Sequence, residues 1–289
     1  MNKAPLLLKN KTALRKFIKS QKAAGKTIAL VPTMGALHAG HASLIKKARQ
    51  LADAVVVSVF VNPTQFGPNE DFAKYPRTLK EDLLVCQEMG ADAVFAPQPK
   101  EMYFDDRSAW VNEEALSRFL CGARRIGHFK GVCTVVSKLF NLVQPDFACF
   151  GKKDAQQLLI LERMVRDLDF PIKIVECPLI REKSGLALSS RNKYLSPEEK
   201  KEALVLSRSL KAAKDAVAKG KSAAETKKLI AKIIATSPLA KIDYISVCDR
   251  ETLEEVQTFK KGQKILVALA VYFGTTRLID NVWLTTPKK

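Results

Sequence analysis

From Pro32 to His41 the chain reads PTMGALHAGH, a stretch that follows an apolar run and opens an amphipathic pattern. This order predicts a buried strand, a glycine-containing turn and a helix start that carries two imidazoles. The start of a helix gathers backbone N–H groups and the positive end of the helix dipole, which suit a phosphate. His38 and His41, three residues apart, share one helix face. The stretch therefore predicts a polyphosphate site; the alternative is two surface histidines near a turn.

Short apolar segments alternate with helical patterns through the first two thirds of the chain. Strands are expected at 27–31, 54–61, 93–95, 147–150 and 172–175, and helices at 41–52, 78–89, 131–142 and 154–168. This alternation predicts an α/β fold with a parallel sheet and helices on both of its faces. Ligands of such sheets bind beyond the carboxyl ends of the strands, where the histidine pair is expected to lie.

The pattern changes near residue 184. Two Lys- and Ala-rich helices are expected at 197–218 and 222–235, the first with Pro197 in its first turn. Strands are then expected at 242–247, 265–273 and 276–283. We therefore expect two domains, a larger one over 1–183 and a smaller C-terminal α+β domain over 184–289.

Composition excludes several classes of protein. The chain has 289 residues, and its longest apolar run, at 265–273, is far shorter than the ~20 residues that span a bilayer. The apolar segment at 4–8 is too short for the core of a signal peptide. The six cysteines form no CxxC pair, which indicates reduced core residues and no structural zinc site. A cytoplasmic protein without a membrane partner is expected.

The net charge of +18 is the anomaly of the composition. It is compatible with a nucleic-acid partner, an acidic membrane surface, or an anionic substrate in a basic proteome. Many lysines between 200 and 232 alternate with Ala and Leu on the expected helices, which is typical of solvated faces. No recognised nucleic-acid motif occurs, so we expect no nucleic-acid partner.

The phosphate-binding fingerprints of two large classes are missing. No GxGxxG follows the first expected strand, and no GxxxxGK[ST] occurs in the chain. In contrast, His38-Ala39-Gly40-His41 resembles the HxGH signature shared by nucleotidylyltransferases and class I aminoacyl-tRNA synthetases. That superfamily uses a Rossmann-like sheet and attacks the α-phosphate of ATP, so the resemblance implies both for the larger domain.

Five further motifs extend the resemblance over nearly the whole chain. They are VFVNPTQFG at 59–67, YPRT at 75–78, GHFKGV at 127–132, FGKKDAQQ at 150–157 and LALSSRN at 186–192. Together with Pro32–His41, these motifs resemble those of the pantoate–β-alanine ligase family. The resemblance is densest between Val31 and Leu195.

The resemblance implies an activity. The enzyme would join (R)-pantoate to β-alanine with ATP and Mg²⁺, giving pantothenate, AMP and diphosphate through a pantoyl-adenylate intermediate. The larger domain would bind ATP and pantoate, the smaller one would act as a lid, and the protein would be a homodimer.

The resemblance also assigns the site. His38, His41 and Lys153 would be catalytic, with His41 as a proton donor and Lys153 stabilising charge that develops at the α-phosphate. Gln65 and Gln157 would bind pantoate, and Gln65 would also lie near β-alanine. The residues assigned to ATP are Met34, Gly35, Ala36, Leu37, His38, Ala39, Gly40, His41, Gly151, Lys152, Lys153, Asp154, Ile180, Leu188, Ser189, Ser190 and Arg191.

Taken from the residues alone, several of these positions have an ordinary structural alternative. The two glutamines fit exposed loop residues, and Asp154 fits a helix N-cap. The segment Ser189–Arg191 has the composition of a common turn. Glu81 and Asp82 are compatible either with water-mediated contact to Mg²⁺ or with exposed helix charges.

Three positions depart from the family pattern. Lys152 replaces the usual glutamate, which indicates that this acid is dispensable and that the local field is more positive. Ile126 replaces the usual proline, and Cys121 stands where some relatives carry glutamate. The last two changes bear on the side-chain contacts of the loop around residues 121–126, but not on the reaction.

Two other functions remain as alternatives. A nucleotidylyltransferase would keep AMP in its product and would release no free AMP. A tRNA-directed binding protein would use the basic surface and would show strongly salt-dependent RNA binding.

Overall fold

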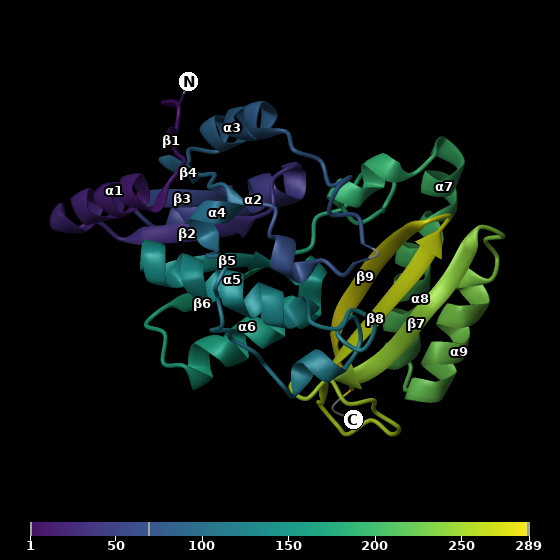
Figure 1. Ribbon diagram of the computed structural model, residues 1–289. Helices are drawn as coiled ribbons and strands as arrows, with labels where there is room; N and C mark the ends of the chain where they lie inside the picture. Colours follow the sequence, from purple (N-terminus) through teal and green to yellow (C-terminus); the bar gives the residue numbers. More distant parts are fainter. Residues whose placement is uncertain (1, 69, 288–289) are drawn as a thin grey trace. The chain divides into compact units, whose positions relative to one another are not determined.

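The structure is a computed structural model that describes residues 2–68 and 70–287. The chain divides into two units, each described by itself here. The N-terminal unit takes the described parts of Met1–Glu114, Arg125–Lys152 and Gln157–Pro178, and the C-terminal unit takes those of Ala115–Arg124, Lys153–Gln156 and Leu179–Lys289. Each unit contains one sheet (Figure 1).

A six-stranded parallel sheet forms the centre of the N-terminal unit, in the order β1-β4-β3-β2-β5-β6. The strands are β1 (Leu6–Leu8), β2 (Ile28–Thr33), β3 (Ala54–Val59), β4 (Ala93–Phe95), β5 (Phe147–Gly151) and β6 (Lys173–Cys177). The predicted parallel sheet is therefore confirmed. The short strand β1 was not predicted, because three leucines carry no periodicity until they pair with β4.

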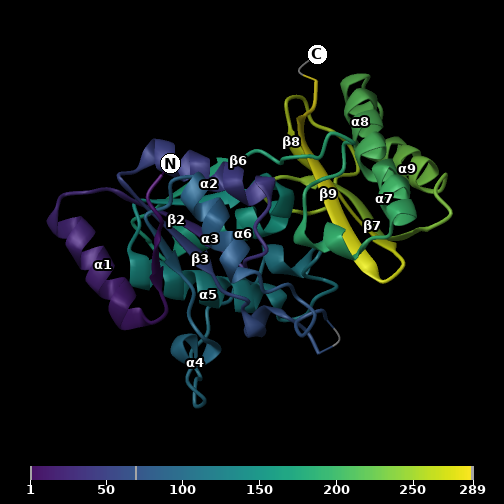
Figure 2. The same cartoon turned by 90° about the horizontal axis from the view of Figure 1, so that it is seen from above.

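Helices cover both faces of this sheet (Figure 2). Alternate strand residues point to opposite faces, and one set, including Ala29 and Val31, packs with Leu44 and Ile45 of α2 and Cys86 of α3. On the other face α1 contacts α5, and α5 contacts α6 through Ser137 and Met164. The helices are α1 (Lys11–Ala23), α2 (Ala39–Leu51), α3 (Leu79–Glu88), α4 (Pro99–Met102), α5 (His128–Val143) and α6 (Ala155–Asp167).

The strand order reverses its direction between β2 and β5. From β2 the chain proceeds through β3 to β4 on one side, whereas β5 leads to β6 on the other. Crevices outside the carboxyl ends of strands at such a switch point are where open α/β sheets bind ligands. The His38–His41 helix start follows β2, and Lys152 follows β5. The topology thus puts both predicted phosphate-binding segments after the two central strands.

An antiparallel sheet of three long strands forms the C-terminal unit, in the order β7-β8-β9. The strands are β7 (Ala240–Asp249), β8 (Lys264–Phe273) and β9 (Thr276–Thr285). A register shift between Ile242 and Tyr244 marks a bulge in β7. From Phe273 to Lys264 the register of β8 on β9 is unbroken, so β9 is paired along its whole length.

Three helices belong to the C-terminal unit: α7 (Pro197–Glu202), α8 (Leu204–Ala218) and α9 (Ala223–Ile234). Of these, α8 and α9 pack on the sheet. Pro197 lies at the start of α7, as predicted, after the Ser196 cap. The single helix predicted over 197–218 is wrong. Ala203 ends α7 and begins α8, and Leu206 N donates to Ala203 O at 3.1 Å, an i→i+3 bond that tightens the backbone there.

In the part of the chain that the structure describes, no helix is both long and apolar enough to cross a membrane. The six cysteines are all buried and unlinked, as expected for core thiols. The remaining short helical turns are η1 (Pro63–Gln65), η2 (Leu116–Arg118), η3 (Lys152–Asp154) and η4 (Ser190–Tyr194).

Candidate active site

The two histidines form both halves of a capping box at the start of α2. His38 is the N-cap, with an extended backbone, and its Nδ1 accepts from Gly40 N at 3.1 Å. In return, His41 Nδ1 accepts from His38 N at 3.4 Å, and the ring centroids are 4.1 Å apart. Because both Nδ1 atoms accept hydrogen bonds, each neutral ring carries its proton on Nε2. The structure therefore brings the predicted pair together as two Nε2–H donors.

A buried carboxylate holds the turn that precedes His38. Asp82, on α3, accepts from Leu37 N at 2.8 Å and from Ala36 N at 3.2 Å. Burial raises the pKa of the Asp82 carboxyl, although these backbone N–H groups favour its ionised form. Gly35 has φ +80°, and a Cβ there would lie 2.9 Å from Asp82 Oδ2. The turn therefore requires both the glycine and the acid.

The burial of Asp82 excludes one of the two interpretations drawn from the sequence for this residue. It is 1% exposed, so it is not an exposed helix charge; Glu81, in contrast, is exposed. Both Asp82 oxygens accept hydrogen bonds from backbone N–H groups of the turn assigned to ATP. Within 2–68 and 70–287, no group of three or more His, Cys, Asp or Glu side chains is placed to hold a metal ion.

Gln65 lies in η1, which follows β3, and its side chain is 8% exposed. Its Nε2 is 3.0 Å from the sulfur of Met34, a residue of the ATP-assigned turn, and its Oε1 accepts from Asn62 Nδ2 at 3.0 Å. Asn62 in turn accepts from the Tyr103 hydroxyl at 2.8 Å. Gln65 is therefore not an exposed loop residue, and the structure places it beside Met34.

The backbone of Gln65 is held by the segment that contains Ile126. His128 Nδ1 is 2.8 Å from Gln65 O, and Arg125 Nη2 donates to the same oxygen at 3.4 Å. Arg125 also forms a two-bond ion pair with Glu70, at 2.7 and 2.6 Å. Burial opposes ionisation of Glu70, but the hydrogen bonds and charge of Arg125 outweigh it and lower the pKa of this carboxyl. Ile126 is 87% exposed, so its departure from the family pattern leaves these contacts intact.

The other two residues that depart from the family pattern, Lys152 and Cys121, also contact polar side chains. Lys152 Nζ forms an ion pair with Glu176 of β6 at 2.6 Å, so part of its added charge is compensated. In the C-terminal unit, Cys121 Sγ lies 3.3 Å from the Tyr244 hydroxyl and 3.5 Å from Arg277 Nη1. Cys121 thus lies beside a hydroxyl and a guanidinium that could also pair with a carboxylate.

The consecutive residues Gln156 and Gln157 have different environments. Gln156 is 5% exposed and donates through Nε2 to Leu116 O at 2.8 Å and Phe119 O at 2.7 Å. Its Oε1 accepts from Cys121 N at 2.9 Å. Gln156 therefore holds a loop of the C-terminal unit, whereas Gln157, the predicted pantoate ligand, is half-buried at the start of α6.

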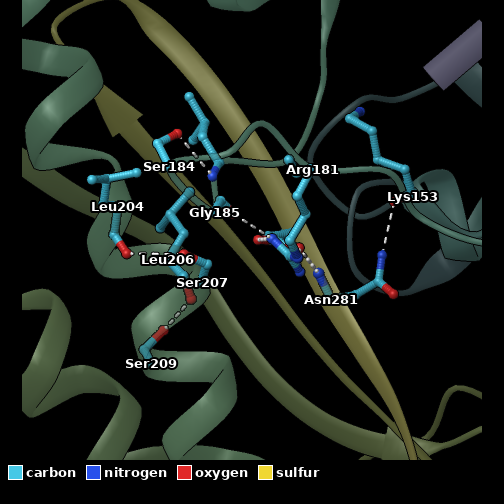
Figure 3. Close-up of polar contacts among 12 residues, drawn as sticks. Lys153, Arg181, Ser184, Gly185, Leu204, Leu206, Ser207, Ser209 and Asn281 are labelled. Carbon is cyan, nitrogen blue, oxygen red and sulfur yellow. Dashed lines mark hydrogen bonds and ion pairs between the residues drawn. The ribbon is translucent and has the colours of Figure 1, made fainter. Parts of the chain in front are cut away.

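Lys153 lies in the turn η3 between β5 and α6. Its Nζ is 3.3 Å from Asp154 Oδ1, and its side chain is 21% exposed. Its backbone carbonyl accepts a hydrogen bond from Asn281 Nδ2 of β9 at 2.8 Å (Figure 3). Nothing in the local pattern of the sequence predicts this contact, because the two residues are far apart in the chain.

Residues 180–188 form a hairpin-like segment, here called the strap, that brings Ile180 and Leu188 together. Leu188 N donates to Ile180 O at 3.0 Å, and Arg181 pairs with Ala187 in an isolated bridge. Ser189 then caps η4, where its Oγ accepts from Arg191 N at 3.3 Å. Asn192, 6% exposed, ties η4 to the strap through Ala187 O at 3.0 Å. These residues therefore form one local structure, and Asn192 is a member that the sequence did not single out.

Comparison with known proteins gives a consistent result. The family model described as pantoate-beta-alanine ligase matches residues 6–283. A pantothenate synthetase from Clostridium novyi is 56% identical over 269 residues, which cover 93% of this chain and 94% of that protein. The crystal structure of pantothenate synthetase from Thermus thermophilus superposes with a TM-score of 0.89 at 45% identity, covering 96% of this chain and 98% of that one.

A second solved structure similar to this chain is that of a complex with ligands. It is the pantoate-beta-alanine ligase from Francisella tularensis complexed with beta-gamma ATP and beta-alanine. It has a TM-score of 0.80 and 34% identity to this chain, and covers 96% of this chain and 97% of its own.

Proposed function

Because this chain belongs to the pantoate–β-alanine ligase family, we propose that His38, His41 and Lys153 carry its chemistry on ATP. The reaction itself is that of the family. The chain condenses (R)-pantoate with β-alanine at the expense of ATP, through pantoyl adenylate, and gives pantothenate, AMP and diphosphate. The assignments below concern the residues that perform each step.

The first step forms the adenylate. The carboxylate of pantoate attacks the α-phosphorus of ATP in line, a P–O bond forms, and diphosphate leaves with the electrons of the bond that breaks. Negative charge on the transferring group is stabilised by the Nε2–H donors of His38 and His41, by the backbone N–H groups at the start of α2, and by Lys153. The capping box on the histidines carries this proposal, since it orients both rings before ATP arrives.

The second step uses β-alanine. Its free amine attacks the acyl carbon of pantoyl adenylate, and a C–N bond forms. The bond from the acyl carbon to the phosphate oxygen breaks, AMP leaves with its electrons, and the amine loses a proton. A buried amide such as that of Gln65 can donate to a carboxylate and accept from a hydroxyl or an ammonium group. We assign pantoate to Gln65 and Gln157, and β-alanine to Gln65. Orientation and shielding of the mixed anhydride from water account for much of the rate.

The other ATP contacts are assigned to the ordered turns described above. They are Met34 to His41, Gly151 to Asp154, Ile180 and Leu188 to Arg191. In this proposal Ser189, Ser190 and Arg191 supply hydroxyls and a guanidinium to the phosphates. Mg²⁺ enters with the nucleotide as Mg–ATP. We also propose that the enzyme is a cytoplasmic homodimer, and light scattering of the purified protein tests the dimer.

Product analysis tests the assignment of the reaction. Purified protein is incubated with Mg–ATP and pantoate, with and without β-alanine, and the products are identified by mass spectrometry. We expect pantothenate and AMP only with β-alanine, and pantoyl adenylate and diphosphate without it. A folded protein that leaves ATP untouched, or that keeps AMP in a stable product, contradicts the proposal.

A further inference from the structure

Two neighbouring residues of β9 break the apolar pattern of the C-terminal sheet. Leu278, Val282 and Leu284 belong to the apolar core of this unit. Asp280 lies two residues from Leu278 and from Val282 along the strand, so its side chain is on the same face as theirs. It is 2% exposed. A buried carboxylate is strongly destabilising unless it is paired. Asn281, 6% exposed, lies on the opposite face of the same strand.

Asp280 is paired with a side chain of the strap. Arg181 donates to its two oxygens at 2.7 and 2.9 Å. It also donates to Gly185 O at 3.0 Å (Figure 3). Asp280 Oδ1 accepts from Asn281 N at 2.7 Å as well. The fork geometry of the guanidinium thus fixes the backbone of β9 at Asn281 relative to the strap.

The side chain of Asn281 is oriented without ambiguity. Trp283 Nε1 donates to Asn281 Oδ1 at 2.9 Å, and an indole N–H can only donate. The amide nitrogen is therefore the atom that faces Lys153 O, 2.8 Å away. Both ends of this amide are engaged, so a residue of the paired strand β9 holds the backbone of Lys153.

We propose that Asn281 is a positioning residue for adenylate formation: it acts through Lys153 by holding the main chain of the η3 turn. This inference rests on the proposed role of Lys153. The backbone of the η3 turn determines where the long side chain of Lys153 begins. Because misplacement of a reacting group by about 1 Å can reduce a rate by about 10²-fold, a strand-based anchor matters for the rate.

A double-mutant cycle tests this inference. The variants are Asn281→Leu, Lys153→Ala and both together, and the readout is pantoate-dependent diphosphate release in a single turnover. We expect Asn281→Leu to slow this step by about 10- to 100-fold in the wild-type background. In the Lys153→Ala background the same change should have little further effect, because the side chain that it positions is gone.

Ser209→Ala is the matched control. Ser209 is buried in the same unit and donates to Leu206 O at 2.8 Å, far along the chain from the η3 turn (Figure 3). The Ser209→Ala substitution should lower the melting temperature slightly and leave the single-turnover rate unchanged. Equal slowing by Asn281→Leu in both backgrounds overturns the inference alone. An unimpaired Lys153→Ala enzyme instead overturns the proposed role of Lys153.

Asn281→Asp gives a second, independent readout. The new carboxylate keeps an acceptor for Trp283 but faces Lys153 O with an oxygen that cannot donate. When protonated, it can donate to that carbonyl again. Its rate relative to wild type should therefore rise as the pH falls from about 8 to about 6, because burial raises the pKa of such an acid. A flat ratio in a folded variant contradicts the inference.

Discussion

His38 and His41 each contribute Nδ1 to the capping box of α2, and each ring has a second nitrogen, Nε2, that the cap does not use. Serine or asparagine would cap α2 equally well through a side-chain oxygen. Neither side chain would place a second donor at the far end of a rigid ring. In the proposed mechanism this second donor binds phosphate, a role that the N-cap position of His38 alone does not require.

Two substitutions of His41 separate these roles. Glutamine at the third helical position can still reach back to the N-cap N–H, whereas alanine cannot. We expect His41→Gln to keep the melting temperature and His41→Ala to lose about 0.5–1 kcal/mol of stability. Diphosphate release should fall by about 10²- to 10³-fold in both. Wild-type release by either folded variant contradicts the role of the imidazole.

Asp82, on α3, holds the turn that precedes His38 through the backbone of Ala36 and Leu37. In Asp82→Asn the amide presents an N–H₂ group to backbone donors, so at least one bond to Ala36 or Leu37 is lost. We expect a loss of about 1–3 kcal/mol of stability and a raised KM for ATP, while the KM for β-alanine is unchanged. Glu81→Gln, at the exposed neighbour, is the control and should change neither. An unchanged KM for ATP in Asp82→Asn contradicts this role.

At the scale of elements, the approach of α5 to η1 sets the position of Gln65. A Cβ on Gly131 would lie 2.3 Å from Thr64 O, a main-chain atom that cannot move without η1. Arg125 and His128 hold the carbonyl of Gln65 from the same helix start. The GHFKGV motif therefore contributes one close backbone contact and one side-chain anchor to the substrate-assigned turn.

Gly131→Ala tests this contact between two elements. The added methyl group must displace η1, so we expect about 1–3 kcal/mol of destabilisation and a raised KM for pantoate. Gly220→Ala is the matched control: its φ is +77°, and nothing lies within 4 Å of the added Cβ. It should lose about 1–2 kcal/mol through backbone strain, with unchanged kinetics. Equal KM values for pantoate in the two variants contradict the role of Gly131.

At the scale of the whole molecule, the net charge of +18 is only partly accounted for. Lys152 and Glu176, Lys221 and Glu225, and Lys227 and Glu255 form ion pairs, but acidic residues are too few to pair every cation. Exposed pairs of this kind contribute little to stability. The excess favours anionic ligands in general, and ATP and pantoate are both anionic.

Ligand-induced stabilisation distinguishes these substrates from a nucleic acid. A ligand that binds only the folded chain stabilises it by about 2.7 kcal/mol at a hundred times its Kd. We expect Mg–ATP with pantoate to raise the melting temperature measured by differential scanning fluorimetry. Mg²⁺ with pantoate but without ATP is the control and should raise it less. A large shift with RNA and none with Mg–ATP would favour the RNA-binding alternative.

The family, the reaction and most of the order of strands and helices were readable from the sequence, although helices α1 and α4 were not predicted. These features depend on local patterns: periodicity, turn residues, and contiguous motifs such as PTMGALHAGH. The break at Ala203, the short strand β1, and the anchors Asp82 and Asn281 were not readable. Most of these depend on residues far apart in the chain, and a hydrogen bond across such a separation leaves no periodic signal. Only folding brings Asp82 to the Leu37 turn and Asn281 to Lys153.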